Sequence, residues 1–113
     1  MDKKALILIV DDNAGHRELL VWTLELYGFK TISATCGFEA VKLAIEFQPG
    51  LVLMDLNMPG MNGFEATRAI HAHRRGKKIP VVAVSAHCLD SEFGSWTREA
   101  GFIAFAQIGR AHV

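Results

Sequence analysis

The sequence has few cysteines and no excess of charge of either sign. Its two cysteines, Cys36 and Cys88, are too few for a disulfide framework, and they fit small core residues in a reducing compartment. Lys plus Arg number 12 and Asp plus Glu number 12, so a net charge of zero gives no argument for binding to nucleic acid or to a membrane. The apolar run at residues 5–10 is too short for a signal peptide or a membrane-spanning helix. We therefore expect a cytoplasmic protein.

The sequence does contain enough apolar residues to form the core of one domain. Half of its 113 residues are hydrophobic, and no linker, repeat or low-complexity stretch divides them. Short apolar runs alternate with segments of helical periodicity. We expect strands at 5–10, 30–34, 51–55, 80–86 and 102–106, and helices at 13–27, 39–47, 63–74 and 89–100. This alternation predicts an α/β fold with a parallel sheet, helices on both faces, and ligands at the carboxyl ends of the strands.

Several residues have expected structural roles in these elements. Asn13 is a candidate N-cap of the first helix, and Gly28 a candidate for the residue just after its end. Trp22 and Trp96 are expected to pack inside the protein. The basic run at 71–78 is interpreted as a solvated helix end, and the histidines show no spacing typical of a metal site.

Acidic residues stand where the buried strands end. Asp11 and Asp12 follow the first strand, Asp55 ends the second, and Ser85 lies near the end of the third. In a parallel sheet these residues share one edge, where each pair of carboxylates at about 4 Å costs about 4 kcal/mol at an effective dielectric of about 20. A cation would offset this repulsion. Oxygen ligands without His or Cys favour Mg²⁺, which prefers to share its ligands with phosphate oxygens. The cluster therefore indicates phosphoryl transfer.

The loop after Asp55 fits this chemistry. The stretch LVLMDLNMPGMNG, residues 51–63, runs from a buried strand into several Gly and Asn residues. Such residues tolerate positive φ and close approach of the backbone. A carboxylate held beside them can attack phosphorus and form an aspartyl phosphate.

Together these motifs resemble the receiver domain of two-component response regulators. The likeness covers residues 5 to about 107 and rests on ILIVDDN, LVLMDLNMPGMNGFEATRAI, IPVVAVSA and EAGFIAFA. It implies a flavodoxin-like, doubly wound, five-stranded parallel sheet in the order 2-1-3-4-5.

The resemblance also implies residue roles. Asp55 matches the phosphoacceptor, Ser85 the hydroxyl that bonds a phosphoryl oxygen, and Phe105 the switch aromatic. Four residues match the Mg²⁺ site: Asp11, through a metal-bound water, Asp12, Asp55 and the backbone carbonyl of Asn57. Each role has a structural alternative. Asp11 could stabilise the next helix N-terminus, Asp55 could be a turn residue, and Ser85 and Phe105 could be ordinary core residues.

The sequence departs from the family pattern near its end. A Lys is expected three residues beyond Phe105, but Ile108 and Gly109 stand there, and the family's final helix does not follow. Either the receiver is degenerate, or the record is damaged. We favour damage, because IGRAHV is what one frame of a common sequencing adapter encodes. We therefore expect an incomplete receiver domain at 1–107, with its final helix missing, and a non-native tail at 108–113.

The expected function is a phosphorylation-activated signalling switch in a two-component phosphorelay. A histidine kinase or a histidine phosphotransfer protein would donate the phosphoryl group with Mg²⁺, and a downstream effector or a lost output domain would respond. Direct binding of nucleic acid or membrane is not expected, nor is turnover beyond its own phosphorylation and dephosphorylation. Two alternatives remain. One is a phosphorylation-independent interaction module. The other is an aspartyl-phosphate phosphatase, which is less favoured because Asn57 stands where a second acid would be needed.

Overall fold

A computed structural model describes residues 6–85 and 104–107 of the chain. Its elements are β1 (Leu6–Val10), α1 (Ala14–Leu26), β2 (Lys30–Ala34), α2 (Gly37–Phe47), β3 (Leu51–Asp55), α3 (Gly63–Ala72), β4 (Val81–Ser85) and β5 (Ala104–Gln107). The expected helix at 89–100 and the expected tail at 108–113 lie outside the described residues, as do Cys88 and Trp96.

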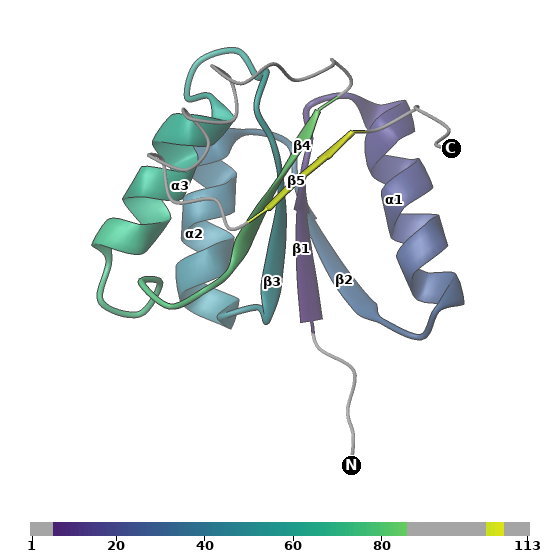
Figure 1. Cartoon of the computed structure of the whole chain (residues 1–113), viewed down its shortest axis with the longest axis horizontal. Helices are drawn as coiled ribbons and strands as arrows, with labels where there is room; N and C mark the ends of the chain where they lie inside the picture. The colour runs from purple at the N-terminus through teal and green to yellow at the C-terminus, as the bar shows by residue number, and fades with distance from the viewer. Residues whose placement is uncertain (1–5, 86–103, 108–113) are drawn as a thin grey trace.

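The strands form one parallel sheet, as the alternation of elements predicts, in the order β2-β1-β3-β4-β5 that the family resemblance implies (Figure 1). Central β1 pairs with β2 on one side and with β3 on the other. Its residues Leu8 and Ile9 have no exposed surface, which is why this strand reads as a continuous apolar run. At the edge of the sheet, β2 is more exposed and more polar, as expected for an edge strand.

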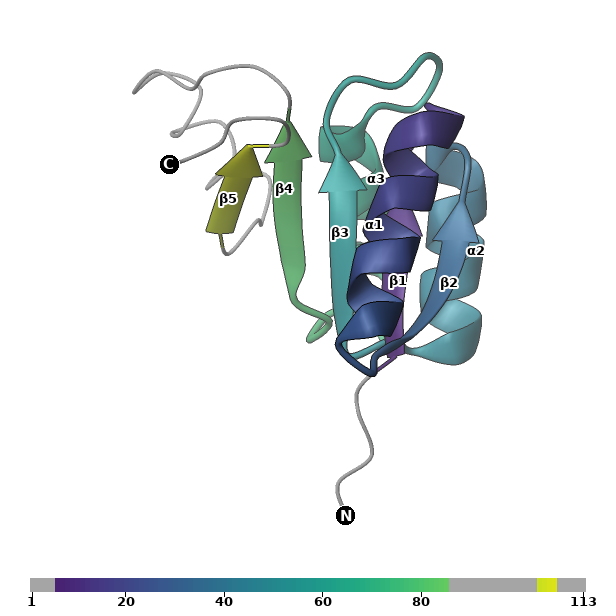
Figure 2. The same ribbon diagram turned by 90° about the vertical axis from the view of Figure 1, so that its right-hand side faces the viewer.

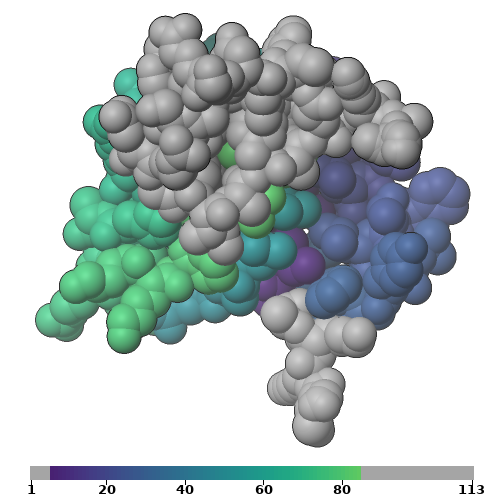
Figure 3. Space-filling model, viewed as in Figure 1, coloured from purple at the N-terminus to yellow at the C-terminus, as the bar shows by residue number. Residues whose placement is uncertain are grey.

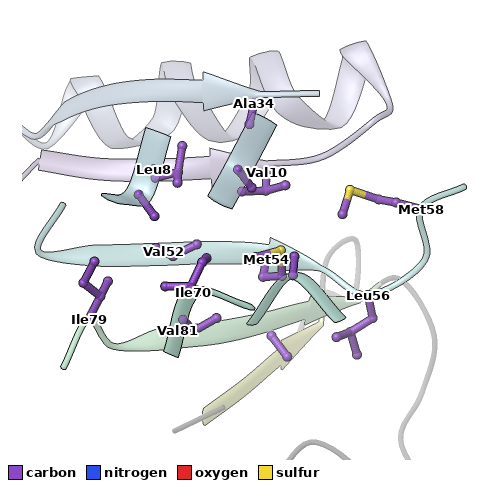
Figure 4. Close-up of a cluster of buried hydrophobic side chains, with 14 residues drawn as sticks. Leu8, Val10, Ala34, Val52, Met54, Leu56, Met58, Ile70, Ile79 and Val81 are labelled. Atoms are coloured by element: carbon purple, nitrogen blue, oxygen red, sulfur yellow. The ribbon is translucent and has the colours of Figure 1, made fainter. Parts of the chain in front are cut away.

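Helices cover both faces of the sheet, with α2 and α3 on one face and α1 on the other (Figures 1 and 2). Alternate residues of the central strands point toward α2 and α3. There they form the main core (Figure 4), which includes Leu8, Val10, Val52, Met54 and Ile70. This core fixes the relative positions of β1 and β3, and therefore of the residues at their ends.

The face that carries α1 is less well covered. No residue of α1 is buried, and Leu51 and Leu53 of β3 are only half-buried. Within the described residues, β4 and β5 lie beside α1 rather than beneath it (Figure 2). The prediction that Trp22 packs inside is wrong, because 65% of this residue is exposed on the outer side of α1.

The ends of α1 are confirmed in detail. The Asn13 side chain accepts a hydrogen bond from the backbone N–H of His16 at 2.9 Å, which makes it the N-cap. Gly28 follows the C-cap Tyr27 and has φ of 91°, a conformation that favours glycine.

Other boundaries differ from the predictions by one or two residues. Helix α2 begins at Gly37 rather than at 39. In its first turn, the side chain of Glu39 accepts a hydrogen bond from the Thr35 backbone N–H at 2.8 Å. Helix α3 ends at Ala72 rather than at 74, because His73 has extended backbone and starts a turn. Strand β4 begins at Val81 rather than at 80, and β5 ends at Gln107 rather than at 106; the other expected limits of these strands lie outside the described residues.

None of the helices in the described part of the chain combines the length and apolar character needed to cross a bilayer.

Candidate functional site

Three carboxylates meet at the carboxyl end of the central strands. One side-chain oxygen from each of Asp11, Asp12 and Asp55 lies within 4.8 Å of the others. Asp55 is the last residue of β3, whereas Asp11 and Asp12 directly follow β1, its parallel neighbour. Adjacent parallel strands have their carboxyl ends on the same side of the sheet, so the pairing of β1 with β3 brings the acids together. The predicted convergence of these three side chains is confirmed.

Asp11 is held firmly in a buried position. Only 1% of the residue is exposed, and its Oδ1 accepts a hydrogen bond from the backbone N–H of Asn13 at 2.9 Å. Its backbone N–H donates to the Ala34 carbonyl at 3.1 Å, which continues the pairing between β1 and β2 by one residue. Arg17 donates from Nη1 to the Asp11 carbonyl at 2.8 Å. The position of the buried acid is therefore determined by both the sheet and α1.

Asp55 is half-buried and is held by the loop that follows it. Its Oδ1 accepts a hydrogen bond from the backbone N–H of Asn57 at 3.0 Å. Gly63 closes the loop against the strand end. A Cβ at this position would meet the Asp55 carbonyl oxygen, and would lie 2.9 Å from the Leu56 Cα. Only glycine allows α3 to begin so close to the acid.

A capping box fixes the start of α3 at the end of the same loop. The Asn62 side chain accepts from the Glu65 backbone N–H at 2.9 Å, and the Glu65 side chain accepts from the Asn62 backbone N–H at 3.0 Å. Earlier in the loop, Met58 is buried although the residues beside it are exposed. Both ends of the segment that follows Asp55 are therefore anchored.

The environment of Asp55 favours its neutral form. Burial, with smaller contributions from the nearby Asp11 and Asp12, raises the pKa of the Asp55 carboxyl to about 7, against the opposing effect of the Asn57 hydrogen bond. A carboxyl that is half-protonated at neutral pH is a poor nucleophile until a positive charge offsets its neighbours. A cation bound beside the three acids would lower this pKa and so favour the charged form of Asp55.

The donor set fits a magnesium ion. All three side chains offer carboxylate oxygen, and the cluster contains no His or Cys ligand. Asp12 is exposed and Asp55 half-buried, so the cluster is open to solvent on one side. Mg²⁺ is commonly bound by one or two carboxylates and keeps several of its waters. The arrangement thus matches the chemistry of this ion.

Of the remaining predicted residues, Asn57 and Ser85 lie near the carboxyl ends of the central strands, and Phe105 lies farther away. Asn57 is exposed in the loop after β3, and its backbone N–H is bound to Asp55. Ser85 is the last residue of β4, one position beyond Val84, which pairs with Asp55. Phe105 lies in β5 and pairs with Ala83. The backbone thus places Ser85 next to the acidic cluster and Phe105 two strands away from β3.

Two residues near the cluster were not predicted as site residues from the sequence. Arg17 binds the Asp11 carbonyl, and His16 Nδ1 lies 3.8 Å from Asp11 Oδ2. Both occupy the first turns of α1, directly after the acids. Helical periodicity from the Asn13 cap could have identified Arg17, which is four residues later and on the same side of the helix.

Comparison with known proteins identifies this arrangement. The model of the response regulator receiver domain matches residues 7–102. The chain belongs to the receiver-domain family. Protein PilH of Pseudomonas aeruginosa is 42% identical over 81 residues, which cover 72% of this chain and 67% of PilH. The polar-differentiation response regulator DivK of Brucella ovis is 35% identical over 86 residues, covering 76% of this chain and 70% of DivK.

Solved receiver structures have the same fold. The chemotaxis protein CheY4 of Vibrio cholerae superposes with a TM-score of 0.90 at 25% identity, covering 96% of this chain and 90% of CheY4. The receiver domain of the sensor histidine kinase PA1611 from Pseudomonas aeruginosa gives 0.86 at 26% identity, covering 96% and 88%. The PA1611 structure has a magnesium ion coordinated in its active-site cleft. As a receiver domain, the chain is a component of two-component signalling.

Proposed function

We propose that this receiver domain is a phosphorylation-activated switch of a two-component phosphorelay, with Asp55 as its phosphoacceptor. The observation that carries the proposal is the position of Asp55, at the end of a central strand with two further carboxylates within 4.8 Å. A histidine kinase or a histidine phosphotransfer protein donates the phosphoryl group, and a downstream effector or output domain responds to the phosphorylated state.

The chemical step is a phosphoryl transfer between side chains. A carboxylate oxygen of Asp55 forms a bond to phosphorus while the bond from phosphorus to the donor's histidine nitrogen breaks. The imidazole keeps the electron pair of the broken bond and takes up a proton. The product is an aspartyl phosphate, and attack by water later returns the free carboxylate. The domain promotes its own phosphorylation and dephosphorylation and does not turn over a separate substrate.

Asp11, Asp12, Asp55 and the backbone carbonyl of Asn57 are the proposed Mg²⁺ ligands, with Asp11 acting through a metal-bound water. Bound there, the ion supplies positive charge that offsets the negative charge on the phosphoryl oxygens. The raised pKa of Asp55 supports this assignment, because a bound cation would offset the neighbouring negative charges and favour the ionised carboxylate. The Asn57 N–H and the close approach at Gly63 orient the Asp55 carboxylate.

Ser85 and Phe105 are proposed to transmit the change. Ser85 ends β4 beside the acidic edge, where its hydroxyl would bond a phosphoryl oxygen in the active state. Phe105 in β5 is the proposed switch aromatic. A shift of these residues between two arrangements would change the surface offered to the downstream partner.

Incubation with acetyl phosphate and Mg²⁺, followed by intact-mass measurement, tests the proposal. We expect one phosphoryl group on the wild-type chain and none on Asp55→Asn. The matched control is Glu46→Gln, which removes an exposed acid on α2 and should leave the adduct unchanged. Chelation of Mg²⁺ should prevent formation of the adduct.

Other outcomes would replace the proposal by a defined alternative. An adduct that persists in Asp55→Asn would place the acceptor elsewhere. Rapid multiple turnover of the phosphodonor would indicate an aspartyl-phosphate phosphatase. A folded wild-type chain that gains no phosphoryl group from acetyl phosphate or from a histidine phosphotransfer protein would indicate a phosphorylation-independent interaction module.

A further inference from the structure

A cationic turn, residues 73–78, lies at the amino ends of the strands, opposite to the carboxyl ends where the acidic cluster lies. Four of its residues carry a fixed positive charge: Arg74, Arg75, Lys77 and Lys78. All four are exposed, whereas Gly76 between them is buried. No Asp or Glu occurs between Glu65 and Asp90. The chain therefore carries a local excess of positive charge that its net charge of zero conceals.

The four cationic side chains have no partner in the described part of the chain. They form neither an ion pair nor a hydrogen bond there; only the backbone of Arg75 is engaged. A single unpaired surface cation is ordinary, because exposed ion pairs contribute little to stability. Four cations within five positions, with no acid nearby in sequence, repel one another. An anionic surface would offset this repulsion.

The turn is rigid, because its backbone is closed by several hydrogen bonds. The Gly76 N–H donates to the His73 carbonyl at 2.9 Å, and the Ile79 N–H donates to the Gly76 carbonyl at 3.1 Å. The Arg75 N–H donates to His73 Nδ1 at 3.0 Å, and His71 Nε2 lies 2.8 Å from the Ile79 carbonyl oxygen. A rigid turn loses little conformational entropy when its side chains bind.

The C-terminal end of α2 packs against the turn. Gln48 Nε2 donates to the Arg75 carbonyl at 3.1 Å. A Cβ on Gly76 would meet the Ile70 carbonyl oxygen, and would lie 2.9 Å from Ile45 Cδ1 on α2. Gly76, at the centre of the turn, therefore packs against α2 and α3, whereas the four cationic residues are exposed. The atoms of this region, green in Figure 3, protrude at the lower left of the molecule.

An exposed aromatic residue lies at the same end of the strands as the cationic turn. Phe47 is the last residue of α2, next to Gln48, which holds the turn, and 50% of it is exposed. Cations and an exposed aromatic side chain at one end of a protein suit the interface of an anionic bilayer, where the cations meet headgroups and the ring enters the apolar boundary. Duplex DNA would engage the cations through its phosphates, but its bases are paired and stacked inside the helix and would give Phe47 no apolar environment.

We propose that the cationic turn, together with Phe47, binds the surface of an anionic lipid bilayer. The binding goes beyond the proposed function and requires no phosphorylation of Asp55. Five-residue strands separate the turn from the acidic cluster by about 17 Å, so the cluster of a bound molecule faces away from the lipid. The zero net charge predicted no membrane binding. A bilayer, however, senses charges within a Debye length of about 8–10 Å rather than the sum over the chain.

Flotation with lipid vesicles tests this proposal on the full 113-residue chain, since aggregated protein sinks while vesicle-bound protein rises. The vesicles contain phosphatidylcholine with phosphatidylglycerol, or phosphatidylcholine alone. One variant combines Arg74→Gln, Arg75→Gln and Lys77→Gln. The control combines Lys30→Gln, Lys42→Gln and Arg68→Gln, which are exposed cations elsewhere. Both variants lose the same charge, and circular dichroism checks their folding.

We expect binding to the anionic vesicles only, weakening with salt. Binding should fall roughly a hundredfold in the turn variant and little in the control, because each cation near an anionic surface contributes roughly a fivefold gain. Phe47→Ser should weaken binding several-fold. Equal losses in the two charge variants would show a net-charge effect and overturn the proposal. Failure of the wild type to float would also overturn it, as would selective binding of duplex DNA over vesicles in a direct competition. The Asp55→Asn variant should float like the wild type, which separates this test from that of the phosphoacceptor.

Discussion

A carboxylate oxygen of Asp55 lies within 4.8 Å of one from Asp11, at the ends of adjacent parallel strands. Asp11 is almost fully buried and Asp55 half-buried, so solvent screens their repulsion only in part. Burial and these charges raise the Asp55 pKa to about 7. A proton and a divalent cation therefore compete for the same carboxylate near neutral pH.

The apparent affinity for Mg²⁺ should depend steeply on pH. Below the raised pKa of Asp55, which is about 7, the proton must leave before the ion binds. We expect the affinity to fall roughly tenfold for each pH unit below this value and to level off above it. Isothermal titration calorimetry with Mg²⁺ in buffers on both sides of neutrality measures the effect. In Asp55→Asn the slope should nearly vanish, and an equally steep slope in that variant would assign the proton to another group.

The stability of the metal-free protein should change with pH in the opposite direction. The folded-state pKa of Asp55, about 7, lies above the ordinary aspartate value of 3.8, so the protonated form is favoured by folding. This contribution is fully present below the unfolded pKa and is lost as pH rises through the folded pKa. With chelator present, Asp55→Asn should therefore stabilise the fold above neutral pH by about 1–2 kcal/mol, a value reduced for solvent screening. Urea denaturation should show no such gain in acid, near the unfolded pKa.

The sequence predicted the sheet and the acidic cluster because local signals determine both. Continuous apolar runs identify β1 and β3, and an acid directly after each strand must lie at the same edge once the strands are parallel. The Asn13 cap and Gly28 were also predictable, since each satisfies a requirement of the adjacent helix end. These features depend on neighbours in sequence and on one topological rule.

Features that depend on tertiary contacts were not predictable in this way. The end of α3 at Ala72 depends on the turn that starts at His73, and the exposure of Trp22 depends on which side of α1 faces the sheet. The bond from Arg17 to the Asp11 carbonyl joins residues in different elements. The raised pKa of Asp55 requires knowledge of its burial, which composition and spacing do not provide.

Gly63→Ala should damage both the fold and the site. The new methyl group would meet the Asp55 carbonyl oxygen and lie 2.9 Å from the Leu56 Cα, and neither backbone atom can move without displacing the strand end. We expect a loss of about 2–4 kcal/mol in urea denaturation. Mg²⁺ affinity should fall as well, because the carboxylate of Asp55 moves with its backbone.

Gly60→Ala is the matched control for this steric effect. Gly60 has φ of +74°, but nothing lies within 4 Å of an added Cβ. Its substitution should cost only about 1 kcal/mol of backbone strain and leave Mg²⁺ binding nearly unchanged. Equal losses in the two variants would mean that loop conformation, rather than close packing against Asp55, makes Gly63 necessary.

The outer surface of α1 should cause the chain to self-associate. Three large apolar residues are exposed along one side of this helix, at spacings of three and four residues: Leu19 (51% exposed), Trp22 (65%) and Leu26 (72%). Contiguous apolar surface of this kind favours association. Sedimentation velocity of the 113-residue chain should therefore show a mean mass that rises with concentration.

Replacing Trp22 and Leu26 together by Gln should reduce this association. Both residues are already mostly exposed, so the free energy of unfolding should change by no more than about 0.5 kcal/mol for each. Phe38→Gln is the control, because Phe38 is as exposed (66%) but lies on α2, at the other face of the sheet. Its substitution should leave the concentration dependence unchanged. A wild-type chain that stays monomeric at every concentration, with a sharp cooperative thermal transition, would show that α1 does not mediate association.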